Sequence, residues 1–352
     1  MCNMRRLGLL GLAMTAGLLI SGCSGSYDGG LPRGKATAGL ESAFQDYLAF
    51  VEQDKQKVQS IMILKDGKVV IEHWMNGGSP DKPHVLHSVS KTFTSMAAGM
   101  AINEGLLSLD DKVISFFPDN LPDTVSDNLA AMTVRDLLTM SCGHSVEPKR
   151  GGRKTDWVSS FLAWPVEHTP GTYFWYNSMG TYMVSAIVQK VTGQKVVDYL
   201  KPRLFDPLGI DYPKWEESPQ GINCGGWGLY LKTEDLAKMG QLLLQNGIWL
   251  KQQLIPAEWI AEASRRQVDS RPAGWTAEAC AGNNMTTENN PWMQGYGYQI
   301  WRNTPGGYRA DGARGQYIMV FPEKNAVIAV TADEGRLEDE LEGVWDHLYD
   351  VL

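Results

Sequence analysis

The sequence has few of the residues that build metal centres, disulfide scaffolds or nucleic-acid surfaces. Only five of its 352 residues are cysteine, no CxxC pair is present, and the six histidines form neither an HxH nor an HExxH pattern. A zinc site is therefore not predicted. Lysine and arginine, 32 together, are outnumbered by 40 aspartates and glutamates, which gives a formal net charge of -8. This acidic balance argues against nucleic acid or an anionic membrane surface as the main partner.

The chain also lacks a phosphate-binding loop and any internal repeat, so nothing predicts a nucleotide or a repeat architecture. What is present is an ordinary globular composition, with 43% hydrophobic and 20% charged residues. The length is enough for a sizeable core and fits one large domain or two medium ones.

One apolar stretch, residues 7–20, follows two arginines and leads to Leu-Ile-Ser-Gly-Cys ending at Cys23. Its 14 residues are too few to span a bilayer comfortably, and its basic start is typical of an export leader. The sequence before Cys23 resembles a bacterial lipobox. That resemblance implies cleavage after residues 1–22, a lipid on Cys23 and, because Ser24 follows, anchoring in the outer membrane facing the periplasm. An ordinary secretory signal or a short membrane anchor is the alternative.

Three cysteines lie beyond the predicted leader and lipidation site: Cys142, Cys224 and Cys280. An exported location permits one disulfide with one thiol left over. Three buried free thiols fit the sequence equally well.

The hydrophobic pattern predicts strands near both ends of the chain and helices between them. Residues 60–64 and 68–74 are β-rich and are joined by Asp66 and Gly67, a strong hairpin signal. Further strands are predicted at 298–302, 316–321 and 326–331, and helices at 40–52, 88–104, 134–140, 182–191, 234–244 and 337–352.

This order favours a mixed α/β fold of the α+β kind, with one antiparallel sheet built from both ends and flanked by the terminal helices. An all-helical lobe would be inserted between the two sheet-forming parts. The predicted divisions are a leader at 1–22, a tether at 23–38 and a domain at 39–352. Within the domain, the sheet lobe covers about 39–110 and 250–352, and the helical lobe covers about 111–249.

Ser88 and Lys91 form an S-x-x-K pattern at the start of a predicted helix. Residues three apart share a helical face, so the lysine ammonium can reach the serine hydroxyl. Free N–H groups at the helix start favour the negative charge of an acyl-transfer transition state. Desolvation would lower the pKa of Lys91 and leave a neutral amine that can accept the serine proton. The pattern alone is equally compatible with a helix cap beside a surface charge.

A second S-x-x-K pattern runs from Ser79 to Lys82. Pro80 and Pro83 bracket it within a loop, where no continuing helix can place the lysine beside the serine. This copy is not a candidate.

The residues around Ser88 closely resemble the nucleophile helix of the serine β-lactamase and penicillin-binding-protein superfamily. The similarity continues through 104–113, 134–140 and the Pro-Gly-Thr at 170–172, and covers the chain from about residue 40 to its end. The pattern is most similar to the branch that holds class C β-lactamases, family VIII esterases, D-amino-acid peptidases and 6-aminohexanoate-oligomer hydrolases. The resemblance implies a β-lactamase/transpeptidase-like fold and a serine hydrolase that requires no metal or organic cofactor.

The resemblance also implies a Y-x-N motif, and the matching place has Tyr176, Asn177 and Ser178. Serine therefore stands where asparagine is usual. Tyr176 matches the family's catalytic tyrosine, whose hydroxyl can relay a proton to the leaving group and later activate water. Asn177 and Ser178 are expected to bind the substrate. A tyrosine that merely packs in an aromatic loop is the structural alternative.

The third motif of the superfamily, K-T-G or H-x-G on a strand, matches residues 310–312, with Gly312 at its glycine. By resemblance, the strand passes beside the substrate at Gly312. The backbone N–H groups of Ser88 and Ala313 would then form the oxyanion hole. A simple bulge or turn is the alternative for this glycine-rich stretch.

Ala310 occupies the place of the basic residue in this third motif. That residue would normally meet the carboxylate of a β-lactam or peptide. Its loss lowers the expectation of β-lactamase or carboxypeptidase activity, unless Arg309 or Arg314 replaces it.

The sequence thus predicts an exported, lipid-anchored serine hydrolase that forms an acyl-enzyme on Ser88. Its partner would be a small ester, amide or peptide-like substrate, and Trp175 and Trp227 are candidates for the cleft wall. One alternative is a D-peptidase, penicillin-binding protein or weak β-lactamase acting on cell-wall-like substrates. The other is a binding lipoprotein that has kept the cleft and lost turnover.

Overall fold

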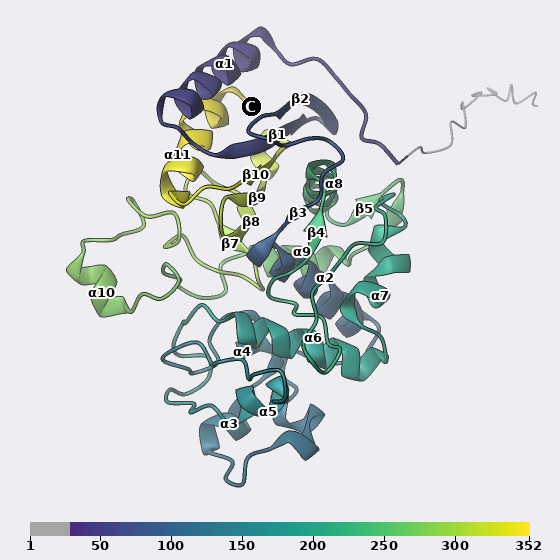
Figure 1. Cartoon of the computed structure of the whole chain (residues 1–352), viewed down its shortest axis with the longest axis vertical. Helices are drawn as coiled ribbons and strands as arrows, with labels where there is room; N and C mark the ends of the chain where they lie inside the picture. Colours follow the sequence, from purple (N-terminus) through teal and green to yellow (C-terminus); the bar gives the residue numbers. More distant parts are fainter. Residues whose placement is uncertain (1–28) are drawn as a thin grey trace, which may run out of the picture.

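The computed structural model describes residues 29–352, so the predicted leader, the lipidation site Cys23 and the first part of the tether lie outside the described residues. At the centre is a six-stranded antiparallel sheet with the strand order β2-β1-β10-β9-β8-β7 (Figure 1). Its strands are β1 (Val58–Lys65), β2 (Lys68–Trp74), β7 (Trp301–Arg302), β8 (Tyr308–Gly312), β9 (Gln316–Phe321) and β10 (Ala326–Ala332).

Both ends of the chain build this sheet, as the sequence predicts. Asp66 and Gly67 have φ values of 51° and 75°, so both adopt the left-handed backbone that a two-residue hairpin turn needs. The turn fixes β2 beside β1, while β10 arrives from the other end of the chain. Ile63 of β1 consequently lies opposite Ile71 of β2 on one side and Ile328 of β10 on the other.

Helices cover both faces of the sheet. The terminal helices α1 (Ala38–Gln53) and α11 (Leu337–Leu348) pack on one face, and α8 (Thr233–Leu244) packs on the other (Figure 1). Successive residues of β1 serve the two layers, because strand side chains alternate: Ile63 joins the cluster under α1 and α11, and Leu64 joins the larger core that includes α8. The site described below lies at the edge of this second core.

The position of α8 corrects the predicted boundary of the helical lobe. This helix falls within the predicted lobe at 111–249, yet it packs on β9 and β10. Gly240 allows the close approach, since a Cβ there would lie 2.4 Å from a methyl carbon of Val327. The predicted boundary at residue 249 therefore falls one helix too late.

The helical part surrounds α2 (Ser90–Asn103), whose residues are buried continuously from Ser90 to Ala101. Figure 1 places α3 to α6 on the side of α2 away from α1 and α11. Within residues 29–352, no helix has both the length and the apolar character needed to cross a membrane. The remaining elements are α3 (Asp127–Ala131), α4 (Val134–Leu138), α5 (Trp157–Leu162), α6 (Ser178–Thr192), α7 (Val196–Leu200), α9 (Ala257–Ser264), α10 (Ala277–Gly282), β3 (His84–Val85), β4 (Tyr230–Leu231), β5 (Ile248–Trp249) and β6 (Gln252–Gln253).

The predicted strand at 298–302 is shorter than expected and is limited to β7. Gln299 has a φ of 65°, and its backbone N–H donates to Leu138 O, so the segment before β7 turns away from the sheet. The buried Gln299 side chain accepts a hydrogen bond from Thr181 Oγ1 (2.6 Å) and donates to Leu138 O (2.9 Å). A tertiary role of this residue therefore overrides its strand propensity.

The second half of the predicted tether, residues 23–38, is docked on the body. Leu31 is only 5% exposed. The Arg33 guanidinium pairs with Glu72 and Glu234, both at 2.8 Å. The tether prediction is therefore wrong from residue 29 onward, because this segment has apolar and ionic partners.

The three described cysteines, Cys142, Cys224 and Cys280, are buried free thiols. The structure thus selects free thiols over a disulfide. Burial raises the pKa of each thiol, which keeps it protonated and unreactive.

Candidate active site

Ser88 and Lys91 lie together at the start of α2. His87 adopts a left-handed backbone with a φ of 46° and begins a short 3-10 turn that leads directly into the helix. The Lys91 ammonium donates to Ser88 Oγ (2.9 Å), Ser178 Oγ (3.1 Å) and Gly226 O (2.8 Å). Three acceptors from three segments therefore hold the lysine Nζ against the serine hydroxyl.

Burial gives Lys91 a pKa suited to proton transfer. The side chain is 1% exposed, and desolvation lowers its pKa to about 7. The negative charges of Glu147 and Asp311 oppose this effect but do not reverse it. A substantial fraction of Lys91 is consequently neutral near pH 7 and can accept a proton.

Tyr176 lies on the other side of the same two groups. Its ring centroid is 4.8 Å from Lys91 Nζ, and it lines the same cavity as Ser88. The ring stacks on Trp301 with the centroids 5.4 Å apart. Burial raises the pKa of Tyr176 well above its ordinary value, so the hydroxyl keeps its proton at neutral pH and can donate it.

The two residues after Tyr176 have different positions. Ser178 Oγ accepts from Lys91, as described above. Asn177 is 1% exposed and caps α6, with its Oδ1 accepting from Gly180 N (2.9 Å) and its amide nitrogen 3.2 Å from His144 Nδ1. The prediction that Asn177 binds substrate is therefore wrong, because the cap already engages its side chain.

The third motif brings β8 against the nucleophile turn. A Cβ on Gly312 would lie 2.4 Å from Leu86 O, so only glycine allows the strand to approach this closely. Ala313 follows Gly312 and lines the same cavity as Ser88. Both residues thus line one cavity, as an oxyanion hole built from their two backbone amides requires.

Neither arginine replaces the basic residue that is missing from the third motif. Ala310 is buried in the core. Arg309 is 0% exposed and its Nε donates to Asp311 Oδ2 (2.9 Å). Arg314 is half-exposed and pairs with Asp333, outside the cavity beside Ser88.

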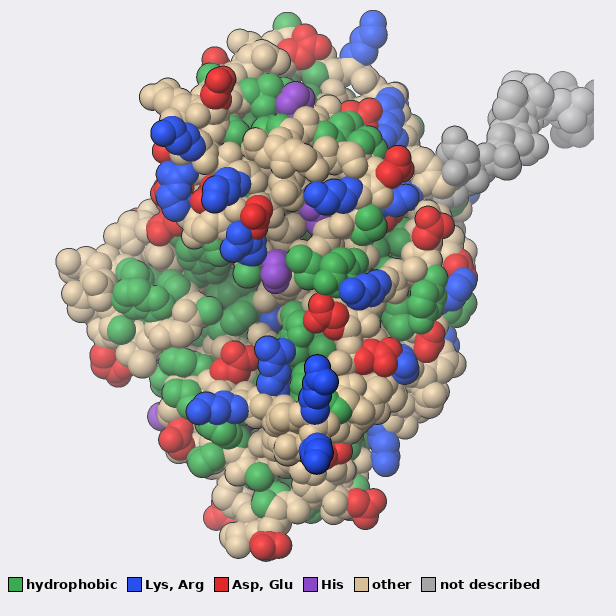
Figure 2. Space-filling model, viewed as in Figure 1, with side chains coloured by type: hydrophobic (Ala, Val, Ile, Leu, Met, Phe, Trp, Pro, Cys, Tyr) green, Lys and Arg blue, Asp and Glu red, His purple; other side chains and the backbone are tan. Residues whose placement is uncertain are grey.

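The cavity beside Ser88 has a volume of about 270 Å³. Figure 2 shows hydrophobic side chains in a hollow between the sheet-bearing part and the helical part, with lysine and arginine side chains over the helical part below it. Such an apolar recess with a few polar groups is typical of small-molecule sites. The residues that line the cavity are Ser88, Tyr176, Pro272, Ala273, Trp292, Trp301, Asp311, Ala313 and Leu337.

Sequence reasoning named Ser88, Tyr176 and Ala313 of this wall and did not name the other six lining residues, among them Trp292, Trp301 and Asp311. Asp311 stands between Ala310 and Gly312, so the alignment of the third motif could have identified it. The two tryptophans carry no local signal beyond the richness of the chain in tryptophan. They reach the site only because β7 and the preceding loop fold back on β8.

A second recess, of about 580 Å³, opens on the other side of Ser178. Trp227 lines this recess and not the cavity beside Ser88, and the Arg150 guanidinium lies 5.2 Å from the centroid of its ring. Trp175 lines neither recess and instead stacks on Tyr173, so its predicted role in the cleft wall is wrong. The lining residues of the second recess are His87, Glu147, Pro148, Lys149, Arg150, Ser178, Met179 and Trp227.

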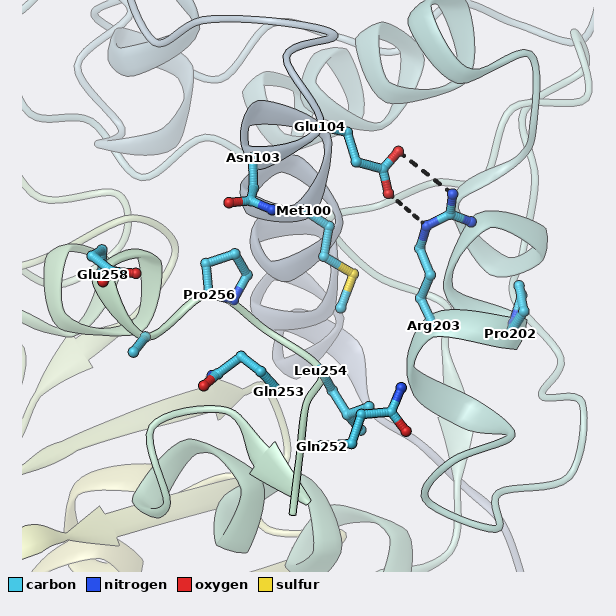
Figure 3. Close-up of a pocket in the computed structure, with 11 residues that line it drawn as sticks. Met100, Asn103, Glu104, Pro202, Arg203, Gln252, Gln253, Leu254, Pro256 and Glu258 are labelled. Carbon is cyan, nitrogen blue, oxygen red and sulfur yellow. Dashed lines mark hydrogen bonds and ion pairs between the residues drawn. The ribbon is translucent and has the colours of Figure 1, made fainter. Parts of the chain in front are cut away.

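Another cavity, of about 540 Å³, lies at the far end of α2 (Figure 3). Met100 and Asn103 of α2 face it, and an ion pair between Arg203 and Glu104, 2.9 Å long, closes one wall. Fifteen residues of helical rise separate it from Ser88, roughly 20 Å. It contains no serine and lysine pair, so the candidate site is the cavity beside Ser88.

Among residues 29–352, no group of three or more histidine, cysteine, aspartate or glutamate side chains is arranged to hold a metal ion.

The chain is similar to several known proteins. The beta-lactamase family model matches residues 40–347. The 6-aminohexanoate-dimer hydrolase of Paenarthrobacter ureafaciens is 26% identical over 292 residues, 76% of this chain and 71% of that protein. Lovastatin esterase of Penicillium rubens is 28% identical over 225 residues, 47% of this chain and 56% of that protein. A family VIII carboxylesterase structure shares the fold, with a TM-score of 0.69 and 14% identity over 91% of this chain and 99% of that one.

Proposed function

Because the chain belongs to the beta-lactamase family and is a serine hydrolase, we propose that Ser88 is its nucleophile and that Lys91 and Tyr176 share the proton transfers. The observation that carries this proposal is the 2.9 Å contact between Ser88 and a lysine whose pKa is about 7. A serine hydroxyl is a weak nucleophile until a neighbouring base takes its proton.

In the acylation step, neutral Lys91 accepts the proton of Ser88 while Ser88 Oγ bonds to the carbonyl carbon of the substrate. The carbonyl oxygen becomes negative and receives hydrogen bonds from the backbone N–H groups of Ser88 and Ala313. When the intermediate collapses, the bond from carbon to the leaving oxygen or nitrogen breaks. The leaving group takes a proton from Tyr176, and Lys91 returns one to Tyr176.

Deacylation reverses these roles. Water loses a proton to the Lys91 and Tyr176 pair and attacks the acyl carbon. The ester bond to Ser88 then breaks, and Ser88 regains a proton as the acid product forms. The titrations of Lys91 and Tyr176 are coupled, so an apparent pKa belongs to the pair.

We propose esters and linear amides of small molecules as the substrate class. The relatives named for cleaving an amide dimer and an ester support this class. The cavity beside Ser88 offers no basic side chain among its lining residues, and a peptide or β-lactam carboxylate would need one. The cavity beside Ser88 therefore does not favour D-peptidase or β-lactamase activity.

A hydrolysis screen tests the proposal, using p-nitrophenyl esters, linear amides, D-peptides and a chromogenic cephalosporin. We expect wild-type turnover of esters or amides and a loss of at least 1,000-fold in Ser88→Ala, as for other removed nucleophiles. Ser79→Ala, which alters the second S-x-x-K pattern, is the matched control and should retain full activity. A fluorophosphonate probe that fails to label Ser88 in the folded wild-type protein would contradict the proposal.

We also propose that the protein is a lipoprotein, anchored through Cys23 in the bacterial cell envelope and facing the periplasm from the outer membrane. The basic start, the apolar stretch and the small residues before Cys23 support this proposal.

A further inference from the structure

The cavity beside Ser88 carries a carboxylate. Asp311 reaches it from β8, one residue before Gly312. Its Oδ2 accepts from Arg309 Nε and from Trp292 Nε1, both at 2.9 Å. Its Oδ1 has no hydrogen-bond partner within residues 29–352, so one acceptor oxygen is left for a ligand.

The surroundings of this carboxylate favour a cation. Tyr176, Trp292 and Trp301 form aromatic walls, and none of the lining residues is basic. Arg309 lies behind Asp311 with its guanidinium fully buried, and it fixes the carboxylate without reaching the cavity. Arg271, on the loop that supplies Pro272 and Ala273, lies over the Tyr173 ring and does not line the cavity. Aromatic rings together with a carboxylate are a suitable environment for an ammonium group.

The position of Tyr176 indicates which part of the substrate enters this cavity, an argument that rests on the proposed function. Tyr176 gives its proton to the leaving group, so the leaving group must lie beside its hydroxyl. Tyr176 and Asp311 line the same cavity, whose volume of about 270 Å³ can hold a group the size of choline.

We infer that Asp311 makes the enzyme select esters and amides whose leaving alcohol or amine carries an ammonium group. A leaving group that carries a carboxylate would lie beside the Asp311 carboxylate with no basic side chain among the lining residues, so like-charge repulsion disfavours it. A lysine or histidine at position 310 would bind a negatively charged group. Asp311, the next residue of the third motif, instead selects a positively charged one.

Three thioesters with the same acetyl group test this selectivity: acetylthiocholine, the neutral isostere S-(3,3-dimethylbutyl) thioacetate, and S-acetyl-3-mercaptopropionate. The released thiol gives kcat/KM for each. We expect at least tenfold higher kcat/KM for the choline thioester than for its neutral isostere, and the lowest value for the carboxylate. Equal values on the cationic and neutral substrates would overturn the inference.

Asp311→Asn should lower the ratio of the cationic to the neutral substrate to about one. Asp269→Asn is the matched control, since Asp269 is an exposed acid on the neighbouring segment, 82% accessible and outside the cavity. It should leave both the ratio and the activity unchanged. An Asp311→Asn enzyme that retains the wild-type ratio would contradict the role of this carboxylate.

Asp311→Asn leaves the buried Arg309 without its partner and can fail to fold. Calorimetric binding of choline and of 3,3-dimethylbutan-1-ol to the wild-type protein then decides the question. We expect at least tenfold tighter binding of choline, and equal affinities overturn the inference.

Thioester cleavage that persists in Ser88→Ala refutes the proposed function, whereas Ser88-dependent cleavage with no charge preference refutes the inference alone.

Discussion

At the scale of single residues, the proposed chemistry depends on removing Lys91 from water. A lysine at the surface would stay charged near pH 7 and could not accept the Ser88 proton. In this protein the desolvation of Lys91 is only partly offset by Glu147 and Asp311, and its pKa is about 7. The neutral form of Lys91 is thus available near pH 7 to accept the Ser88 proton.

This pKa predicts the pH dependence of activity. Lys91 must be neutral to act as base, so kcat/KM for a p-nitrophenyl ester should rise as pH increases and reach half of its plateau near pH 7. Measured initial rates from pH 5.5 to 9 would check this. A half-point near pH 10, the range of an ordinary lysine, would contradict it.

A Glu147 variant tests whether the negative charge of this residue raises the pKa of Lys91. Its charge raises the pKa of Lys91, so Glu147→Gln should move the half-point to lower pH. The amide oxygen can still accept from Ser178 N, which now donates to Glu147 Oε1 at 2.7 Å. Glu167→Gln is the matched control, because Glu167 caps Ser145 nearby and is not among the charges acting on Lys91. A shift to higher pH in Glu147→Gln would be the wrong sign.

At the scale of elements, α11 brings an unusual carboxyl group under the sheet. Glu340 is 1% exposed, and neither of its carboxyl oxygens has a hydrogen-bond partner in the described chain. It lies against Gly315, in the turn that carries Ala313 from β8 to β9. Burial, followed by the charges of Glu334 and Asp311, raises the pKa of Glu340 well above its ordinary value of 4.5.

The raised pKa predicts that stability falls as pH rises. Between pH 4.5 and the raised folded-state value, folded Glu340 keeps its proton while the unfolded chain has lost it. Each pH unit over that interval costs up to ~1.4 kcal/mol of unfolding free energy. Glu340→Gln stays neutral and should melt above wild type at pH 8, by about 2–4 °C for each kcal/mol recovered.

Thermal melts at pH 5 and pH 8 would measure this effect, and the two proteins should differ less at pH 5. Asp339→Asn, a neighbour on α11 that is half-exposed, serves as the control and should show no such pH-dependent gain. A Glu340→Gln protein that is less stable than wild type at pH 8 would show that the carboxylate is stabilising, contrary to this prediction.

At the scale of the whole molecule, the docked segment that begins at residue 29 limits the reach of the proposed anchor. Leu31 and Arg33 hold this segment against the body, so only about eight residues would separate Cys23 from a fixed point. Eight residues span at most ~29 Å even when fully extended. The catalytic body of a lipid-anchored protein would therefore stay close to the membrane.

Metabolic labelling with an alkyne fatty acid in a bacterial host tests the anchor. Wild type should incorporate the label and remain with the membrane fraction, whereas Cys23→Ala should do neither. Cys2→Ala is the matched control, because Cys2 precedes the predicted cleavage point, and it should retain the label. Wild-type protein that takes up no label would contradict the lipoprotein proposal.

The sequence by itself determined the local features whose physical cause lies within a few residues. The Asp66 and Gly67 hairpin and the i, i+3 placement of Ser88 and Lys91 follow from backbone preference and helical spacing. The antiparallel sheet made from both ends also followed, because the strand-like segments occur only near the ends. The family resemblance then gave Tyr176 and Gly312 their places.

Only the tertiary structure decided what each group meets. Residues 29–37 docked on the body because Arg33 found Glu72 and Glu234, which are distant in sequence. Asn177 became a helix cap with His144 against its amide, and Trp175 stacked on Tyr173 outside both recesses. The charge of the cavity was decided in the same way, since Arg309 is buried and Asp311 faces the space beside Ser88. Burial and long-range pairing depend on the packed chain, and they set both the pKa of the base and the charge that a substrate encounters.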